Sequence, residues 1–301
     1  MENISAQEAL VGNLSIHDPS TMIKEGNRYY IFYTGQDIGM KWSSNRVNWT
    51  QGPNVFSNTN RPTWTTNAVP GFGSDFWAPD ITFTNGRYYL YYSVSTFGSN
   101  VSAIGVATNS TLDFTSPNYF WADQGVVIFS TTSVNYNTID PGILLSGDGT
   151  MWMSFGSFFS GIKMIQLNPT TGKRITGSST ISTLATHPPT TAIEGSYLIE
   201  HTNEFYLFVN WDTCCAGVDS TYNIRVGRSS IVTGPYLDRN GVNLASGGGT
   251  MFLESSGRYI GPGHAGVMVD GDTNWFTYHF YDGNNGGNSK LGMGKLSWTP
   301  D

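Results

Sequence analysis

The sequence contains few cysteines and few charged residues. Its 301 residues include two cysteines, Cys214 and Cys215, and these are adjacent. Adjacent cysteines cannot cross-link distant parts of a chain, and two thiols alone are too few ligands for a structural zinc site. We therefore expect two buried free thiols, and a vicinal disulfide is the alternative that stays open.

Basic residues are also scarce, because 15 Lys and Arg stand against 22 Asp and Glu, for a formal net charge of −7. Without a basic face, neither nucleic acid nor a membrane surface is an expected partner. No apolar run approaches the roughly 18 residues that span a bilayer. The first residues, Met1-Glu2-Asn3, lack the basic and apolar regions of a signal peptide. We nevertheless expect a secreted or periplasmic location; a cytoplasmic one and the oligomeric state stay open.

Aromatic residues and glycine are abundant instead. Aromatics make up 14% of the chain against 12% for charged residues, and 36 glycines are spread along it. This composition suits short, aromatic-rich strands joined by tight turns, and it does not suit disorder. The length allows one large all-β domain or two ordinary domains.

Five segments repeat the pattern of a short strand, a turn rich in Gly, Asn or Asp, and an aromatic-rich strand. They begin at Asp18, Trp77, Asp140, Glu194 and His264. Third strands are expected over residues 38–44, 103–108, 161–165, 224–229 and 291–297. A unit of about 60 residues with three or four antiparallel strands is typical of a propeller blade. We therefore predict an all-β fold, a five-bladed β-propeller that forms a single domain over residues 1–301.

The five segments share an internal spacing. In each of them, 11 positions separate the first residue from the start of the aromatic strand, as from Asp18 to Tyr29. Segments in register place their first residues at equivalent positions, and the first strand of a propeller blade lies beside the axis. The sequence therefore predicts one ring of side chains around the central opening, formed by Asp18, Trp77, Asp140, Glu194 and His264.

Three carboxylates in one ring are costly for a purely structural layer, because they repel one another and lose solvation. Asp18 alone, followed by proline, would be read as a turn, but the whole ring favours a functional site. Paired carboxyl groups suit glycoside cleavage, in which one activates water and the other protonates the leaving oxygen. A third carboxylate would keep the acid protonated by repulsion, and Trp77 offers an apolar face to a sugar ring.

Short motifs at these positions resemble those of glycoside hydrolase family 43. The motifs are His17-Asp18-Pro19, Phe76-Trp77-Ala78-Pro79-Asp80, Ile139-Asp140-Pro141-Gly142, Ile193-Glu194-Gly195 and Gly263-His264-Ala265-Gly266. Two further stretches, residues 212–217 and 221–229, are similar to the arabinan-hydrolysing branch of that family. The resemblance covers roughly residues 12–298. It implies a five-bladed propeller and inverting hydrolysis of the α-1,5-linked arabinofuranose backbone of arabinan, by an endo-arabinanase, with exo action left open.

The resemblance also implies roles for the ring. Asp18 corresponds to the general base, Glu194 to the general acid, and Asp140 to the residue that raises the pKa of the acid and orients it. His264 corresponds to a residue that binds a central ion, often Ca²⁺, largely through water. Imidazole is a poor primary ligand for calcium, so another ion could take the site, and a hydrogen-bonded hub histidine is the alternative. No organic cofactor is expected.

The remaining candidates lie on the rim or in the interior. Substrate contacts are expected at Trp77, Phe97, Ser157, Cys214 and Cys215, although packing is an equal alternative for Phe97. Asp80 is interpreted as structural. Packing between blades is expected for Tyr29, Tyr30, Tyr88, Tyr89 and Trp152.

Two kinds of alternative function remain. An α-L-arabinofuranosidase or a β-xylosidase of the same family would share the hub acids and differ in the rim loops. A non-catalytic carbohydrate-binding propeller belongs to another class; it would more naturally repeat one binding site in every blade. The five ring residues of this chain differ from one another, which favours an enzyme that acts on arabinan or arabino-oligosaccharides.

Overall fold

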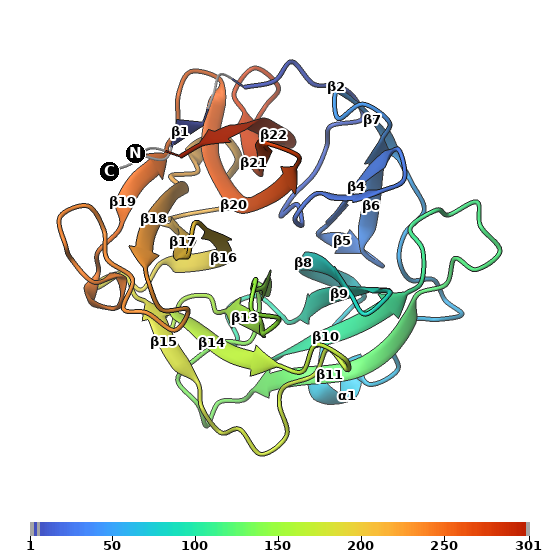
Figure 1. Ribbon diagram of the computed structural model, residues 1–301, viewed down its shortest axis with the longest axis horizontal. Coiled ribbons are helices and arrows are strands. Elements are labelled where there is room, and N and C mark those ends of the chain that lie inside the picture. Colours follow the sequence, from blue (N-terminus) through green and yellow to red (C-terminus); the bar gives the residue numbers. More distant parts are fainter. Residues whose placement is uncertain (1–2, 5–6, 299–301) are drawn as a thin grey trace.

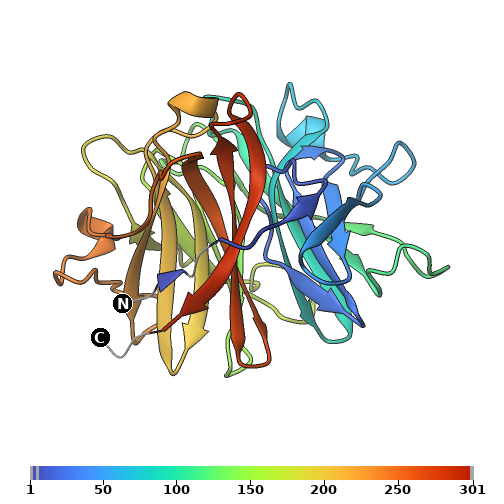
Figure 2. The same cartoon turned by 90° about the horizontal axis from the view of Figure 1, so that it is seen from above.

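The computed structural model describes residues 3–4 and 7–298, and it arranges them as five sheets around a central axis (Figures 1 and 2). Each sheet is one blade, and its strands follow one another outward from the axis in chain order, apart from two short N-terminal strands that join the outer edges of two blades. The predicted five-bladed propeller is therefore confirmed.

The first two blades have five strands each. Blade 1 consists of β3 (Ile23–Glu25), β4 (Arg28–Tyr33), β6 (Gly39–Ser43), β7 (Asn48–Gln51) and, parallel to β7, β2 (Val11–Gly12). Blade 2 consists of β8 (Asp75–Thr84), β9 (Arg87–Val94), β10 (Ser102–Asn109), β11 (Ala122–Ser130) and, beside β8, β5 (Gly35–Gln36).

The other three blades have four strands each. Blade 3 consists of β12 (Gly142–Leu145), β13 (Met151–Phe155), β14 (Ile162–Leu167) and β15 (Ser182–Ala185). Blade 4 consists of β16 (Ile193–His201), β17 (Glu204–Trp211), β18 (Asn223–Ser229) and β19 (Thr250–Leu253). Blade 5 consists of β20 (Tyr259–Asp270), β21 (Thr273–Asp282), β22 (Asn288–Ser297) and β1 (Asn3–Ile4).

Blade 5 closes the ring, because it combines the two ends of the chain. Strand β1 pairs antiparallel with β22, with Asn3 opposite Ser297 and Ile4 opposite Leu296 (Figure 1). An N-terminal strand that completes the last sheet ties the first and last blades together and leaves no gap in the ring. The three short helices are α1 (Thr65–Ala68), η1 (Gly217–Asp219) and η2 (Leu244–Ser246), and no helix among the described residues is long and apolar enough to cross a membrane.

The apolar core is divided into five clusters, each between two neighbouring blades. Because successive side chains of a strand point to opposite faces, the second strand of a blade contributes to two clusters. Tyr30 of β4 packs toward blade 2 and Tyr29 toward blade 5, whereas Tyr88 of β9 packs toward blade 1 and Tyr89 toward blade 3. Trp152 packs against the cluster between blades 3 and 4. The expected packing roles of these aromatics are confirmed.

Candidate active site

The five predicted ring residues lie at or near the start of the first strand of each blade. Asp18 and Asp140 come before β3 and β12, and the other three lie within β8, β16 and β20. Asp18, Trp77, Asp140 and Glu194 line one cavity of about 740 Å³. His264 is buried, and its Nδ1 is 3.6 Å from Oδ1 of Asp18.

The backbone near each ring position is left-handed. The φ angle is +45° at Asp18, +57° at Asp140 and +61° at His264; in blades 2 and 4 the next residue takes this conformation, Ala78 with +44° and Gly195 with +57°. A residue other than glycine loses roughly 1–2 kcal/mol in this region. Such strain persists only where surrounding contacts hold the backbone.

Those contacts come from the preceding blade in every case. Each left-handed residue donates its backbone N–H to a side chain of that blade. The pairs are Asp18 to Nδ1 of His279 (3.1 Å), Ala78 to Oγ1 of Thr34 (2.8 Å), Asp140 to Oγ of Ser93 (2.9 Å), Gly195 to Oδ2 of Asp140 (3.1 Å) and His264 to Oδ1 of Asn210 (3.0 Å). Four acceptors lie in or directly after the second strand of their blade, and the fifth is itself a ring carboxylate.

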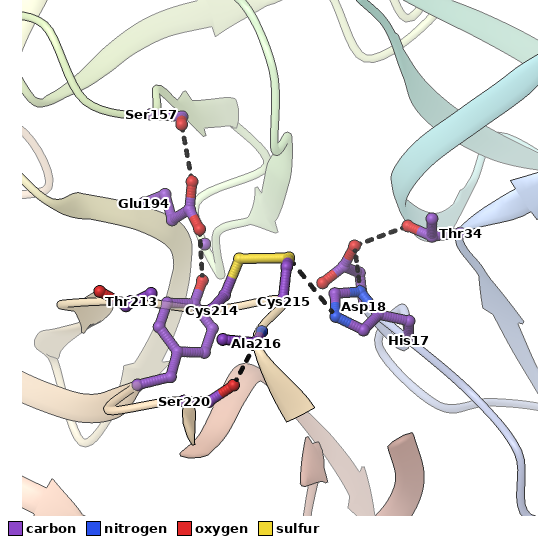
Figure 3. Close-up of a disulfide and its surroundings, with 12 residues drawn as sticks. His17, Asp18, Thr34, Ser157, Glu194, Thr213, Cys214, Cys215, Ala216 and Ser220 are labelled. Atoms are coloured by element: carbon purple, nitrogen blue, oxygen red, sulfur yellow. Dashed lines mark hydrogen bonds and ion pairs between the residues drawn. A yellow bond between two sulfur atoms is a disulfide. The ribbon is translucent and has the colours of Figure 1, made fainter. Parts of the chain in front are cut away.

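Asp18 is surrounded by hydrogen-bond donors and imidazoles. Its Oδ2 accepts from Oγ1 of Thr34 at 2.7 Å and lies 2.9 Å from Nδ1 of His17 (Figure 3). Nδ1 of His264 and of His279 each lie 3.6 Å from Oδ1. Burial acts to raise the pKa of Asp18, but the three histidines outweigh it and hold that pKa well below its usual range. Asp18 is therefore an ionised carboxylate, suited to accept a proton.

Glu194 and Asp140 behave in the opposite way. Burial raises the pKa of Glu194, assisted by the charge of Asp18, although hydroxyl hydrogen bonds from Ser157 (2.6 Å, to Oε2) and Tyr222 (3.1 Å, to Oε1) lower it in part. The pKa of Asp140 is raised well above its usual value by burial and then by the charges of Glu194 and Asp18. Two such carboxyls retain a proton under conditions in which an exposed pair would have lost both.

The cavity has aromatic walls, most of them at its rim. The rings of Trp77 and Phe97 have centroids 4.9 Å apart, and Phe97 is 84% exposed, so its ring lies outside the core and contacts Trp77 at the cavity. Phe158 and Phe159, which sequence reasoning missed, also line the cavity, with left-handed φ angles of +53° and +46°. Two successive aromatics with left-handed backbone indicate a functional position, and only the structure shows this conformation.

The two cysteines form a disulfide that lines the same cavity (Figure 3). The expectation of two buried free thiols was wrong, because Cys214 is half-buried and Cys215 is exposed. The physical reason is the turn that carries them: left-handed conformations at Asp212 (φ +70°) and Cys215 (φ +64°) fold the chain back at the cavity wall. Sequence composition contains no indication of this turn.

Asp80 has the structural role expected of it. Its carboxylate accepts the backbone N–H of Thr21 in blade 1 at 2.9 Å and of Ile143 in blade 3 at 2.8 Å, so it joins three blades near the axis. Burial raises the pKa of Asp80 to about 6, against the lowering effect of these hydrogen bonds.

The donor set around His264 suits only a largely hydrated cation. Burial lowers the pKa of His264, which keeps the imidazole neutral and able to bind a metal. The ionised oxygen nearest to it belongs to Asp18. Ca²⁺ takes six to eight oxygen ligands, so water would have to supply most of the coordination sphere. In the described part of the chain, a separate group of His17, Asp18 and His279 has ligand atoms within 4.8 Å of one another, but Nδ1 of His279 already accepts the N–H of Asp18.

An ionised carboxylate and a proton-retaining carboxyl pair in one aromatic-walled cavity define the catalytic centre of a glycoside hydrolase. The match to known proteins is consistent with this class. The chain belongs to glycosyl hydrolases family 43, whose sequence profile matches residues 10–301.

Three relatives illustrate the membership. The extracellular endo-α-(1→5)-L-arabinanase 1 of Bacillus subtilis is 43% identical over 292 residues, covering 95% of this chain and 86% of that protein. The extracellular exo-α-(1→5)-L-arabinofuranosidase ArbA of Cellvibrio japonicus is 38% identical over 295 residues, covering 95% and 84%. The structure of the Cellvibrio cellulosa α-L-arabinanase complexed with arabinohexaose superposes with a TM-score of 0.90 at 36% identity, covering 95% of this chain and 93% of that one.

Proposed function

We propose that this protein hydrolyses the α-1,5-linked arabinofuranose backbone of arabinan with inversion at the anomeric carbon. The observation that carries the proposal is the contrast between Asp18, which is held ionised, and the Glu194–Asp140 pair, which retains a proton, in one cavity. The names of the relatives support the choice of polymer, because both endo- and exo-acting proteins among them are named for α-(1→5)-L-arabinan or arabinofuranose linkages.

The proposed mechanism is a single displacement. Asp18 accepts a proton from a water molecule as that water attacks the anomeric carbon, and Glu194 donates its proton to the departing glycosidic oxygen. Repulsion between the buried carboxyls of Asp140 and Glu194 lets the pair keep one proton, and the proposed mechanism requires this proton on Glu194. After the bond breaks, Asp18 carries the proton and Glu194 is ionised, so one proton exchange with solvent restores the starting state.

Sugar residues would be held by the walls of the cavity. Trp77 and Phe97 offer adjacent apolar faces against which arabinofuranose rings can pack. The disulfide of Cys214 and Cys215 offers a further apolar surface. Ser157 is buried and donates to Glu194, so it would affect the substrate indirectly, by holding the carboxyl of Glu194 in position.

For the hub ion, we propose a hydrated cation, with Ca²⁺ as the first candidate, held through water by His264 and the carboxylate of Asp18. When bound, such an ion would supply positive charge that favours the ionised form of nearby carboxylates. Metal content of the purified protein, measured by mass spectrometry after dialysis, should fall on His264→Ala. Equal metal content in both proteins would refute the site, whatever the activity of either.

The place of action is proposed from two observations. Two relatives are named as extracellular proteins, and disulfides persist in oxidising compartments. We therefore propose that the chain acts outside the cytoplasm.

The decisive experiment is digestion of linear, debranched arabinan, with products resolved by length over time. A spread of oligosaccharides at early times would establish endo action, and one short product from the start would establish exo action. Xylan and an aryl α-L-arabinofuranoside serve as control substrates for the sister activities, and release from either in place of arabinan would refute the proposed substrate.

Matched variants test the residues. Asp18→Asn and Glu194→Gln should each lower kcat by at least about 1,000-fold, since each removes a group that transfers a proton. Asp272→Asn, an exposed carboxylate in the turn between β20 and β21, is the control and should leave kcat unchanged. Near-normal turnover by either hub variant would refute the mechanism.

A further inference from the structure

We propose that Tyr281 is a positioning residue for the general base, and that the Cys214–Cys215 turn holds Tyr281 in place. The inference rests on the proposed role of Asp18 as the base. It adds a specific chain of contacts, from the disulfide turn at the rim to the reacting carboxylate, with Tyr281 as the link.

The chain of contacts is continuous. The backbone N–H of Cys215 donates to the hydroxyl of Tyr281 at 2.7 Å, and this hydroxyl lies 2.8 Å from Nε2 of His17. The other ring nitrogen of His17, Nδ1, lies 2.9 Å from Oδ2 of Asp18. The sulfur of Cys215 is 3.9 Å from Nε2 of His17, so the disulfide also flanks the imidazole directly (Figure 3).

The direction of the hydrogen bonds follows from one fixed donor. A peptide N–H can only donate, so the oxygen of Tyr281 accepts from Cys215 and its proton is free for Nε2 of His17. His17 then carries its proton on Nδ1, where it faces Asp18. If His17 is doubly protonated, Nε2 donates to Tyr281 instead, and Nδ1–H still faces Asp18. In both states an N–H donor faces Oδ2, and Oδ1, which lies 3.6 Å from Nδ1 of His264 and of His279, is the oxygen that remains to accept a proton.

Tyr281 is well placed to transmit the position of the turn. Its side chain is buried at 3% exposure, in β21, two residues after His279. The ring of His17 stacks on that of His279 with centroids 4.2 Å apart, and Nδ1 of His279 accepts the N–H of Asp18. The imidazole of His17 is thus held by the stacked ring of His279 on one face and by the Tyr281 hydroxyl at its edge. Removal of the hydroxyl would leave the imidazole free to rotate in the plane of the stack.

The turn itself is held by several contacts besides the disulfide. The carbonyl of Thr213 accepts the N–H groups of Thr221 (3.0 Å) and Tyr222 (3.1 Å), and the N–H of Ala216 donates to Oγ of Ser220 at 3.1 Å. Cys215 has a left-handed backbone, which is unfavourable for a residue with a side chain. The bond between adjacent sulfurs restricts this turn, so its reduction allows the Cys215 N–H to leave Tyr281.

The first experiment compares Tyr281→Phe with Tyr278→Phe. Tyr278 lies on the same strand in the core between blades 4 and 5, so its variant controls for the loss of a buried hydroxyl. We expect Tyr281→Phe to lower kcat on arabino-oligosaccharides by about 3–10-fold, the effect of one lost hydrogen bond, with KM changed less than about twofold. Tyr278→Phe should leave both parameters as in the wild type. Equal kinetics for all three proteins would overturn the proposal.

A leaving-group series separates the base from the acid. A defect in the acid is compensated by an aryl leaving group of low pKa, whereas a defect in the base is not. The loss in Tyr281→Phe should therefore be the same on oligosaccharides and on aryl arabino-oligosides. A loss that disappears with the activated aglycone would place the effect at Glu194 and refute positioning of Asp18.

A double-mutant cycle tests the route through His17. If Tyr281 acts through that imidazole, Tyr281→Phe should have no further effect on kcat in a His17→Ala background. Effects that multiply would show an independent role and would overturn the proposal. Thermal unfolding of each variant confirms that the comparison is made between folded proteins.

The disulfide arm is tested by reduction. A dithiol such as dithiothreitol transfers two electrons and two protons to the disulfide, which gives two cysteine thiols and the cyclic oxidised dithiol. Reduction should lower kcat of the wild type at least as much as Tyr281→Phe does, and should add little in that variant. The Cys214→Ala/Cys215→Ala protein, which keeps the backbone N–H, should behave like the reduced wild type and should not respond to dithiol. Wild-type kcat after confirmed reduction would refute the role of the turn.

Failure of this inference is distinguishable from failure of the proposed function. If Asp18→Asn abolishes hydrolysis and Tyr281→Phe does not affect it, the base assignment stands and the positioning role is wrong. If Asp18→Asn is itself active, the proposed function fails first.

Discussion

Replacement of Gly195 by alanine should damage both the fold and the acid, because this residue lies at the centre of the hub contacts. Its backbone is left-handed, with φ at +57°, and it directly follows Glu194. A Cβ at this position would lie 2.9 Å from Oδ1 of Asn210, 3.2 Å from the hydroxyl of Tyr222 and 3.4 Å from Nδ1 of His264. Oδ1 of Asn210 accepts the N–H of His264 and the hydroxyl of Tyr222 donates to Glu194, so neither atom can move without loss of a hydrogen bond.

Gly271 supplies the matched control. Its φ is +61°, nearly the same as at Gly195, and a Cβ there would meet no atom within 4 Å. Gly271→Ala should therefore cost only the left-handed conformation of alanine, about 1–2 kcal/mol. Gly195→Ala should cost the same amount plus about 1–3 kcal/mol for the forced shifts in a packed interior.

Two assays read out the difference. With an unfolding entropy of about 2.1 cal/mol/K per residue, about 1 kcal/mol corresponds to about 1.6 °C in Tm for a chain of 301 residues, so Gly195→Ala should melt at least about 1.5 °C below Gly271→Ala. Displacement of the Tyr222 hydroxyl weakens its 3.1 Å hydrogen bond to Glu194, so kcat/KM should fall about 2–10-fold, while Gly271→Ala keeps wild-type activity. Equal Tm values and equal activity for the two variants would refute the steric argument.

Three further variants test other parts of the site. Ser157→Ala removes a hydrogen bond that lowers the pKa of Glu194, so this pKa should rise and the alkaline limb of the pH profile of kcat/KM should move to higher pH; an unmoved limb would count against Glu194 as the acid. Trp77→Ala should raise KM for arabino-oligosaccharides by about 2–10-fold, because the sugar ring loses its packing against the indole, with a smaller change in kcat. An unchanged KM would show that Trp77 does not contact the substrate. Burial raises the pKa of Asp80 from 3.8 to about 6, so the folded state keeps a proton that the unfolded state releases, and stability falls by roughly 3 kcal/mol as pH rises through this interval. Asp80→Asn removes that titration, and its Tm should fall less between pH 4 and 6 than that of the wild type; an identical fall would contradict the argument.

The ring of site residues could be predicted because a propeller converts sequence spacing directly into position. Each blade starts with a hairpin, and the constant interval of 11 residues sets every first residue at the same height relative to its second strand. In the structure, these intervals end at or just after the start of β4, β9, β13, β17 and β21. The local geometry of each hairpin therefore suffices to place Asp18, Asp140 and Glu194 at the hub, without knowledge of any long-range contact.

The groups that tune those carboxylates could not be predicted in the same way. His279 lies 261 positions from the Asp18 N–H that it accepts, and Ser93 lies 47 positions from Asp140. No local pattern connects such partners, since they meet only when neighbouring blades pack. The disulfide was only the alternative expectation, and the strained Phe158–Phe159 pair was missed, for a related reason. Each depends on left-handed backbone in a rim loop, and residue types other than glycine give little indication of that conformation.

One exception in the hub links the backbone of blade 4 to the carboxyl pair. Four ring positions have their N–H held by neutral side chains, whereas that of Gly195 is held by the carboxylate of Asp140. A peptide N–H can only donate, so this contact stabilises the ionised form of Asp140 and lowers its pKa against the effect of burial. The partners of Glu194 are the hydroxyls of Ser157 and Tyr222, which lower its pKa only in part against the effect of burial. The hydrogen bond that fixes the backbone of blade 4 therefore also favours ionised Asp140, the state that the proposed mechanism requires while Glu194 holds the proton.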